Sequence, residues 1–167
     1  EFDALGDMES HIIIAGFGRV GQMLGRILDR EGLPYVAIDV DGPAVGRWRS
    51  ANLPVFYGDA AQIVLLKRTG IERASALVIT LDNYATAEIL VRSVRRHLPA
   101  ISIFARARDT AHARWLLKVG ATAVVPETIE ATLQLSQQVL LCVGSSEEAA
   151  LRHVERERQT EMERLQS

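Results

Sequence analysis

Short apolar runs alternate with amphipathic stretches along this 167-residue chain. Six of the runs are continuously apolar, which is typical of strands buried on both faces of a sheet. The stretches between them carry apolar residues at helical spacing and end at glycine or just before proline. The pattern predicts strands at residues 12–15, 35–38, 55–57, 76–80, 101–105 and 123–125. It predicts helices at about residues 20–31, 43–52, 61–69, 84–97, 110–119 and 127–143.

Three glycines follow the first predicted strand directly. Gly16, Gly18 and Gly21 are spaced G-x-G-x-x-G and lead into the first predicted helix. The first glycine permits a tight turn, the second lets a phosphate approach the backbone, and the third lets helix and sheet pack closely. The free N–H groups of the helix N-terminus attract anions. The motif therefore predicts a dinucleotide-binding βαβ unit.

An acidic residue completes this unit. Asp39 ends the second strand, 18 residues after Gly21, where a carboxylate can accept hydrogen bonds from ribose hydroxyls and repel a 2′-phosphate. The alternative is a plain glycine-rich turn with Asp39 at a solvated strand end. We favour the binding unit because the strand, helix and acid are all in place.

Strands alternate with helices six times, which predicts an α/β fold. We expect a Rossmann-like, doubly wound, six-stranded parallel sheet of order 3-2-1-4-5-6 with C-terminal helices. Residues 1–10 are interpreted as a linker or tail, residues 11–143 as the binding domain and residues 144–167 as a charged C-terminal helix.

In such a sheet, ligands bind beyond the carboxyl ends of the strands. Asp59 and the Ala60 N–H could read the edge of an adenine, and Arg19, Arg106 and Arg108 could attract phosphates or carboxylates. For each arginine the alternative is a surface salt bridge. The expected binding residues are Gly16, Phe17, Gly18, Arg19, Val20, Gly21, Asp39, Val40, Asp41, Gly58, Asp59, Ala60, Thr80, Leu81, Asp82 and Arg106.

Composition excludes several classes. A net charge of −2 argues against a nucleic-acid partner. The longest uncharged run, residues 131–146, is too short to span a bilayer, so this fragment is expected to be soluble. Cys142 is interpreted as core packing, with a reactive thiol as the alternative.

The sequence shows no machinery for chemistry. It lacks G-x-x-x-x-G-K-[ST], G-x-S-x-G and Tyr-x-x-x-Lys, and its four histidines have no metal-ligand spacing. We therefore expect no catalytic residue and no metal, and favour a sensor over an enzyme. A small NAD-dependent oxidoreductase is the main alternative, and a purely structural dimerisation module is the third.

The last two predicted helices differ in character. Apolar residues of 127–143 spread round more than one face, which predicts a homodimer through this helix, with Leu140 in the contact. Ser145 and Glu148 fit a capping box that starts the final helix. Its apolar stripe is thin, so it either lies in solvent or docks on a partner or a second subunit.

Three segments together resemble a known family. GFGRVGQ (16–22), VFYGDA (55–60) and ARARD (105–109) resemble the RCK-N or TrkA-N regulatory nucleotide-binding domain of potassium channels and transporters. The chain is most similar to the domain of Kef-type glutathione-regulated potassium efflux systems, which are potassium/proton antiporters. The resemblance covers about residues 11–143.

The resemblance implies a cytoplasmic regulatory domain of a potassium (cation)/proton antiporter or potassium channel. It implies that AMP or NAD(H) is held at Gly16, Gly18, Asp39, Asp59 and Ala60 and controls transport by conformational change. It also implies a dimer in which the helix after the last strand crosses to the partner. The membrane transport domain would belong to the same full-length protein, which would place this domain at the cytoplasmic face of the inner (plasma) membrane. A glutathione-like effector would bind near Arg106 or Arg108.

Overall fold

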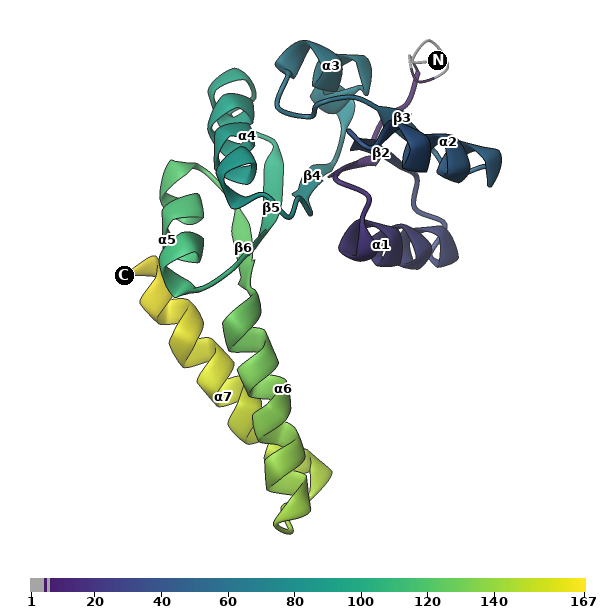
Figure 1. The fold of residues 1–167 in the computed structure, drawn as a ribbon. Coiled ribbons are helices and arrows are strands. Elements are labelled where there is room, and N and C mark those ends of the chain that lie inside the picture. Colours follow the sequence, from purple (N-terminus) through teal and green to yellow (C-terminus); the bar gives the residue numbers. More distant parts are fainter. Residues whose placement is uncertain (1–4, 6) are drawn as a thin grey trace.

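The computed structural model describes residue 5 and residues 7–167. In this part of the chain six strands form one parallel sheet of order β3-β2-β1-β4-β5-β6, as the sequence predicts (Figure 1). The strands are β1 Ile12–Ala15, β2 Tyr35–Asp39, β3 Val55–Tyr57, β4 Ala76–Ile79, β5 Ser102–Ala107 and β6 Ala123–Pro126. The helices are α1 Arg19–Arg30, α2 Gly42–Ser50, α3 Ile63–Arg68, a 3₁₀ turn Ile71–Arg73, α4 Tyr84–His97, α5 Thr110–Val119, α6 Glu127–Cys142 and α7 Glu147–Gln166.

Successive side chains of a strand point to opposite faces of the sheet, and in β1 they enter two different cores. In β1, Ile14 packs in a cluster with Leu28 of α1 and Val45 of α2. Ile13 packs instead in a larger cluster with residues of α3, α4 and α5, among them Leu90. Both faces of β1 are therefore covered, which explains why this strand is apolar throughout.

The sheet is not covered evenly. Phe104 of β5 is 39% exposed and Val125 of β6 is 53% exposed, although their neighbours Ile103 and Val124 are buried against the helices of the other face. This part of the sheet, on the side of α1, has no helix of its own over it (Figure 1). An apolar sheet surface is thus left open within the single chain.

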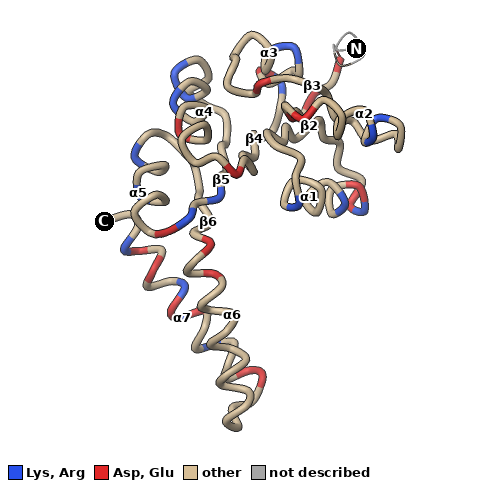
Figure 2. The backbone as a smooth tube through the Cα atoms, viewed as in Figure 1, with Lys and Arg blue, Asp and Glu red and all other residues tan. Residues whose placement is uncertain are grey.

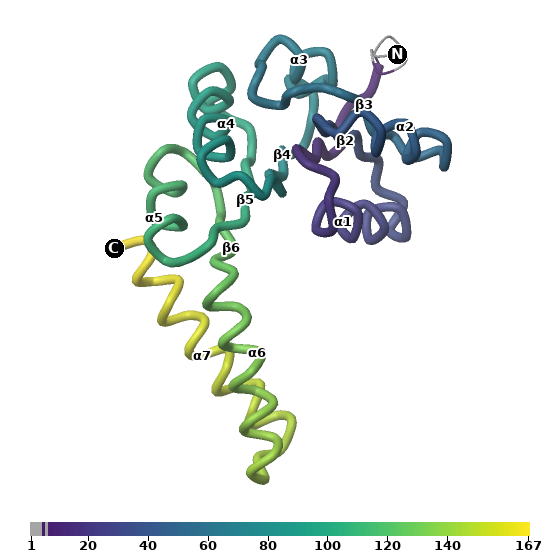
Figure 3. Tube along the Cα trace, viewed as in Figure 1, coloured from purple at the N-terminus to yellow at the C-terminus, as the bar shows by residue number. Residues whose placement is uncertain are grey.

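The last two helices form an arm. α6 and α7 lie side by side and project away from the sheet (Figures 1 and 3). Arg158 of α7 joins them, since its Nε and Nη2 each donate to Glu130 of α6 over 3.0 Å. The hydrogen bonds that Arg158 donates to Glu130 and Glu155 raise the pKa of its guanidinium above the ordinary value. The final helix therefore docks on its own chain, which the sequence did not suggest, and Leu165 reaches the core beside α5.

No helix in the described part of the chain has both the length and the apolar character needed to cross a membrane.

Three local predictions need correction. Cys142 is exposed instead of packed in the core, because the end of α6 extends beyond the body of the domain. The N-cap of α7 is Ser146, whose hydroxyl accepts from the Ala149 N–H over 3.1 Å, so Ser145 does not form the predicted capping box. β5 runs two residues further than expected because Ala107 pairs with Pro126 of β6.

One arginine holds the segments that lead into β5 and β6, at the edge of the sheet where these two strands begin. Arg95, near the end of α4, donates to the carbonyls of Pro99, Ile101 and Gly120 over 2.7 to 2.9 Å. These carbonyls lie in the segments that lead into β5 and β6. The guanidinium thus satisfies loop carbonyls that would otherwise lack partners.

The predicted tail falls partly outside the described residues, which omit 1–4 and 6. Leu5 and Met8 pack against Val36 and Phe56.

Candidate functional site

The turn from β1 into α1 has a shape that depends on glycine. Gly16 has φ +102°, and a Cβ there would lie 2.9 Å from Thr80 Oγ1. A Cβ on Gly21 would lie 2.3 Å from the Gly16 carbonyl oxygen, closer than atoms can approach. Thr80 Oγ1 donates to that same carbonyl. The turn is therefore packed closely against both α1 and Thr80, as the motif predicts for helix and sheet.

Gly18 differs from these two glycines. A Cβ on Gly18 would meet no atom within 4 Å, and the residue is exposed at the N-cap of α1 without any side-chain cap. The backbone is thus bare where the first N–H groups of α1 lack helical partners. This opening can accept an anionic group.

Asp39 holds a fixed position beside the turn. Its Oδ2 accepts from the Phe17 N–H and its Oδ1 from the Asp41 N–H, both over 2.8 Å. Phe17 itself is buried, with its ring edge-on to Trp48 at 5.1 Å between centroids. The two backbone donors set the orientation of the carboxylate before any ligand arrives. Each oxygen keeps a second lone pair for a ribose hydroxyl.

A cavity of about 350 Å³ opens over this carboxylate, and we call it the Asp39 cavity. One wall is the face of α2, which sequence reasoning did not assign to the site. The signal was available, because Ala44, Arg47 and Trp48 follow Asp41 at spacings of three, six and seven and so share one helix face. The lining consists of Gly16, Gly18, Asp39, Asp41, Ala44, Arg47, Trp48, Thr80, Leu81 and Asp82.

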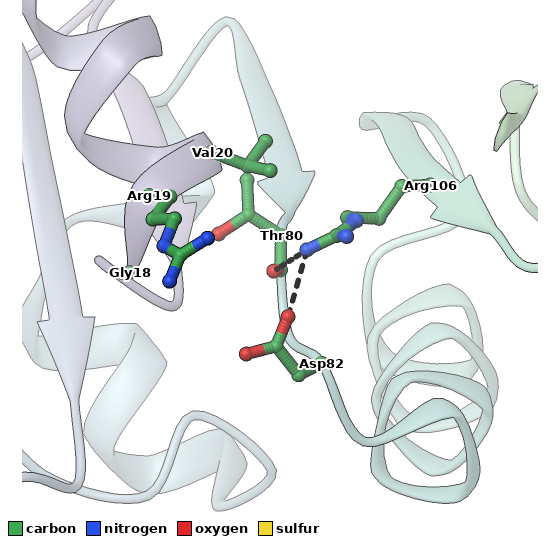
Figure 4. A pocket seen from close by; sticks show the side chains of 6 residues that line it. All are labelled: Gly18, Arg19, Val20, Thr80, Asp82 and Arg106. Carbon is green, nitrogen blue, oxygen red and sulfur yellow. Dashed lines mark hydrogen bonds and ion pairs between the residues drawn. The ribbon is translucent and has the colours of Figure 1, made fainter. Parts of the chain in front are cut away.

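A second cavity of about 350 Å³ also borders Gly18 (Figure 4). Arg19 and Arg106 approach it from opposite sides. It is lined by Gly18, Arg19, Val20, Thr80, Asp82 and Arg106, and we call it the Arg19 cavity. Gly18, Thr80 and Asp82 line both cavities, which therefore form one groove across the turn, the glycine-turn groove.

Arg106 is held by acids in this groove. Its Nη1 donates to Asp82 Oδ1 over 2.9 Å and to the Thr80 carbonyl over 3.1 Å (Figure 4). Its Nε and Nη2 both donate to Glu127, the first residue of α6. These bonds, with Glu127 contributing most, raise the pKa of the Arg106 guanidinium despite its partial burial. The pairing with Glu127 was not foreseen from the sequence.

Some predicted residues lie at this edge but outside the two cavities. Phe17 and Gly21 shape the turn but line neither cavity. The Asp59 carboxylate accepts from the Ala61 N–H over 2.9 Å and, like Val40, Gly58 and Ala60, does not line the groove. A role for these four residues in nucleotide binding stays a prediction, as does adenine recognition by Asp59 and the Ala60 N–H.

Arg108 also lies outside the groove. Its guanidinium stacks over the Tyr84 ring at 4.6 Å, and its backbone N–H donates to His112 Nδ1 over 3.3 Å. The two arginines of the ARARD segment thus have different surroundings.

Comparison with known proteins agrees with this architecture. The chain is 43% identical over 134 residues to K(+) efflux antiporter 2, chloroplastic, from Arabidopsis thaliana, a match that covers 80% of this chain and 11% of the antiporter. The AMP-bound Kef C-terminal domain from Shewanella denitrificans is 34% identical with a TM-score of 0.81, covering 93% of this chain and 94% of that one.

The GsuK channel bound to NAD shares the fold, with a TM-score of 0.72 at 23% identity over 78% of this chain and 24% of the channel. The model of the TrkA-N domain matches residues 12–127. The chain therefore belongs to the TrkA-N domain family.

Proposed function

We propose that this chain is a regulatory domain that binds an adenine nucleotide, AMP or NAD(H), in the glycine-turn groove. It would control potassium or cation/proton transport by a membrane domain of the same full-length protein, at the cytoplasmic face of the inner membrane. The observation that carries the proposal is the open backbone at Gly18 beside a carboxylate that is already oriented. The AMP bound to the Shewanella domain and the potassium antiporter from Arabidopsis support it.

The groove divides naturally between the parts of such a ligand. A ribose would hydrogen-bond to Asp39, and its phosphate would meet the bare backbone of Gly18 and the first N–H groups of α1. AMP would fill the Asp39 cavity alone. The second half of a dinucleotide would continue past Gly18 into the Arg19 cavity.

A regulator fits the groove better than an oxidoreductase. Among its described lining residues, Asp82 is hydrogen-bonded to Arg106, and no nucleophile or proton donor is paired with a base. We therefore expect binding without turnover. NADH that is consumed in the presence of a substrate would favour the oxidoreductase.

The groove should discriminate between nucleotides by the 2′ substituent of the ribose. We expect AMP and NADH to bind about tenfold or more tightly than NADPH, because a 2′-phosphate would face the fixed Asp39 carboxylate and remove two hydrogen bonds. Isothermal titration calorimetry with the three nucleotides measures this directly. In Asp39→Asn the like charge is gone, so the gap between NADH and NADPH should narrow. Equal affinities in the wild-type protein would contradict the assigned role of Asp39.

We also propose a homodimer through α6. Leu135, Val139 and Val143 form an exposed apolar row along this helix, from 60 to 73% exposed, on the side away from α7. Figure 2 shows the second half of α6 without charged residues. The open sheet surface at Phe104 and Val125 offers further apolar area of the kind that a second copy could cover.

Val139→Glu should therefore give a monomer, because it places a charge in the middle of the exposed row. Light scattering coupled to size exclusion at micromolar concentration measures the mass. Gln138→Glu adds the same charge next to the row and should leave the dimer intact. Should the wild-type protein remain near 18.4 kDa on concentrating, the α6 dimer would have to be abandoned.

An acidic, glutathione-like effector is proposed beside the ARARD segment. Arg108 is exposed, whereas the hydrogen bonds of Arg106 go to Asp82, Glu127 and Thr80. Arg108 is therefore the better candidate of the two for its carboxylates.

A further inference from the structure

The two arginines of the Arg19 cavity differ in exposure and in ion pairing. Arg19 is exposed and makes no hydrogen bond or ion pair with any residue that the structure describes. Arg106 has only 18% of its side chain exposed and donates to Asp82, Glu127 and the Thr80 carbonyl. An anion that enters this cavity therefore finds one free cation and one that already holds two carboxylates.

Glu127 is where the groove meets the arm. It is the first residue of α6, whose N-cap is Pro126 and has no side-chain cap. At this base, two polar links tie α6 to the carboxyl edge of the sheet. One is the forked pair from Arg106 to Glu127, and the other is the bond from Thr128 Oγ1 to the Arg108 carbonyl, over 2.7 Å. A change at the base would be enlarged along the projecting helix (Figure 1).

We propose that Glu127 binds the Arg106 guanidinium only while the Arg19 cavity is empty. An anionic group of a ligand in that cavity would replace the Glu127 carboxylate on Arg106 and so release the first turn of α6. This inference rests on the proposed nucleotide site and names how its occupancy would reach the arm. In ADP and NADH it is the second phosphate that binds the Arg106 guanidinium in place of Glu127. Adenosine, which has no phosphate, leaves the pair intact.

The charges favour this exchange. A phosphate that settles near Arg19 and the α1 N-terminus brings negative charge close to Asp82, whose carboxylate is 92% exposed, and to Glu127. Arg106 is the cation that all three anions share, and a phosphate offers the guanidinium a forked partner at least as strong as a carboxylate. Glu127 is 40% exposed, so water can solvate it once it is released.

The position of the arm can be measured through Cys142. It is the single cysteine of the chain, exposed at the end of α6, and a spin label on it reports the arm. A second label at Ala100→Cys reports the body, because this loop lies beside the carbonyls that Arg95 holds. Doubly labelled chains would be diluted with unlabelled Cys142→Ser chains, so that one dimer carries one labelled pair. Pulsed electron paramagnetic resonance then gives the distance between the labels.

In the wild-type protein, ADP or NADH should shift or broaden this distance distribution, and adenosine should not. Glu127→Gln should show the shifted distribution without ligand, because the forked ion pair is lost. It should also bind ADP about fivefold more tightly in calorimetry, with adenosine binding unchanged. Glu130→Gln is the matched control. It removes the same charge three residues further along α6, from a pair with Arg158, and should leave ADP affinity as it was.

The outcomes separate two failures. If ADP and NADH bind but the label distance stays fixed, and Glu127→Gln behaves like the wild-type protein, the coupling through Arg106 is wrong while the nucleotide site stands. A protein that binds none of these nucleotides overturns the proposed function, and the exchange on Arg106 with it. Equal gains in affinity in Glu127→Gln and Glu130→Gln would also overturn the inference, because they would reflect net charge alone.

Discussion

Gly18→Val is expected to abolish nucleotide binding, with a loss of more than about 100-fold, while the domain stays folded. A valine Cβ at this position meets no atom within 4 Å, so the folded protein has room for the side chain. The same open space is where a phosphate must approach the backbone. The branched side chain would fill it and cover the free N–H groups of α1.

Thermal melting with and without AMP or NADH provides the measurement. The ligand-free variant should melt within a few degrees of the wild-type protein, since valine for glycine at an N-cap costs about 1 kcal/mol or less. The added nucleotide should raise the melting temperature of the wild-type protein only. Gly46→Val, on an exposed face of α2, should keep the ligand response. A Gly18→Val protein that is still stabilised by nucleotide would show that the phosphate lies elsewhere.

Gly21→Ala should destabilise the domain strongly even though it adds a single methyl group. The new Cβ would lie 2.3 Å from the Gly16 carbonyl oxygen and 3.2 Å from Thr80 Oγ1. Because the nearest atom belongs to the backbone, α1 must move away from the sheet. We expect a loss of about 3 kcal/mol in the free energy of unfolding, or roughly 6–12 °C in melting temperature.

Gly46→Ala is the matched control, because its Cβ would meet nothing within 4 Å and the residue lies inside α2. It should be neutral or stabilise the domain by up to about 1 kcal/mol, since alanine favours helix. Chemical denaturation of both variants gives the two free energies. If Gly21→Ala unfolds at the wild-type midpoint, the close contact between α1 and the glycine turn is wrong.

The sheet could be predicted because each clue in it is local. The apolar run Ile12–Ala15 and the glycines after it fix β1, the turn and α1 within one short stretch, and strand order follows from the connections. Thr80 and Asp82 could be assigned to the site by the same logic, since parallel strands bring their carboxyl ends to one edge.

Features that depend on direction in space could not be predicted. Periodicity shows that α6 is apolar on several sides, but not that it leaves the body, so the sequence predicts a buried Cys142 where the structure has an exposed one. The sequence predicts Leu140 in the dimer contact, yet this residue is half-buried in the single chain, whereas Val139 is 60% exposed. Ser145 and Ser146 are adjacent residues of the same type, so the sequence does not distinguish which of them is the N-cap.

The sequence also does not predict which side chains pair with one another across the edge of the sheet. Arg106 and Glu127 are 21 residues apart, and either could have faced solvent. Arg47 differs from this pair, because its spacing after Asp41 already indicates the face of α2 that lines the Asp39 cavity.

The hydrogen bonds from Arg95 to the loop carbonyls imply that amide hydrogens exchange slowly at one edge of the sheet and quickly at the other. The backbone near the starts of β5 and β6 is held by a guanidinium that donates to several loop carbonyls. The amide hydrogens of these segments should therefore exchange only through global unfolding. Amides of the glycine turn, whose first helical N–H groups face an open groove, should exchange through small local openings. A nucleotide would then slow hydrogen exchange at the glycine turn far more than beside Arg95. Its stabilising effect would be concentrated at the edge of the sheet that carries this turn.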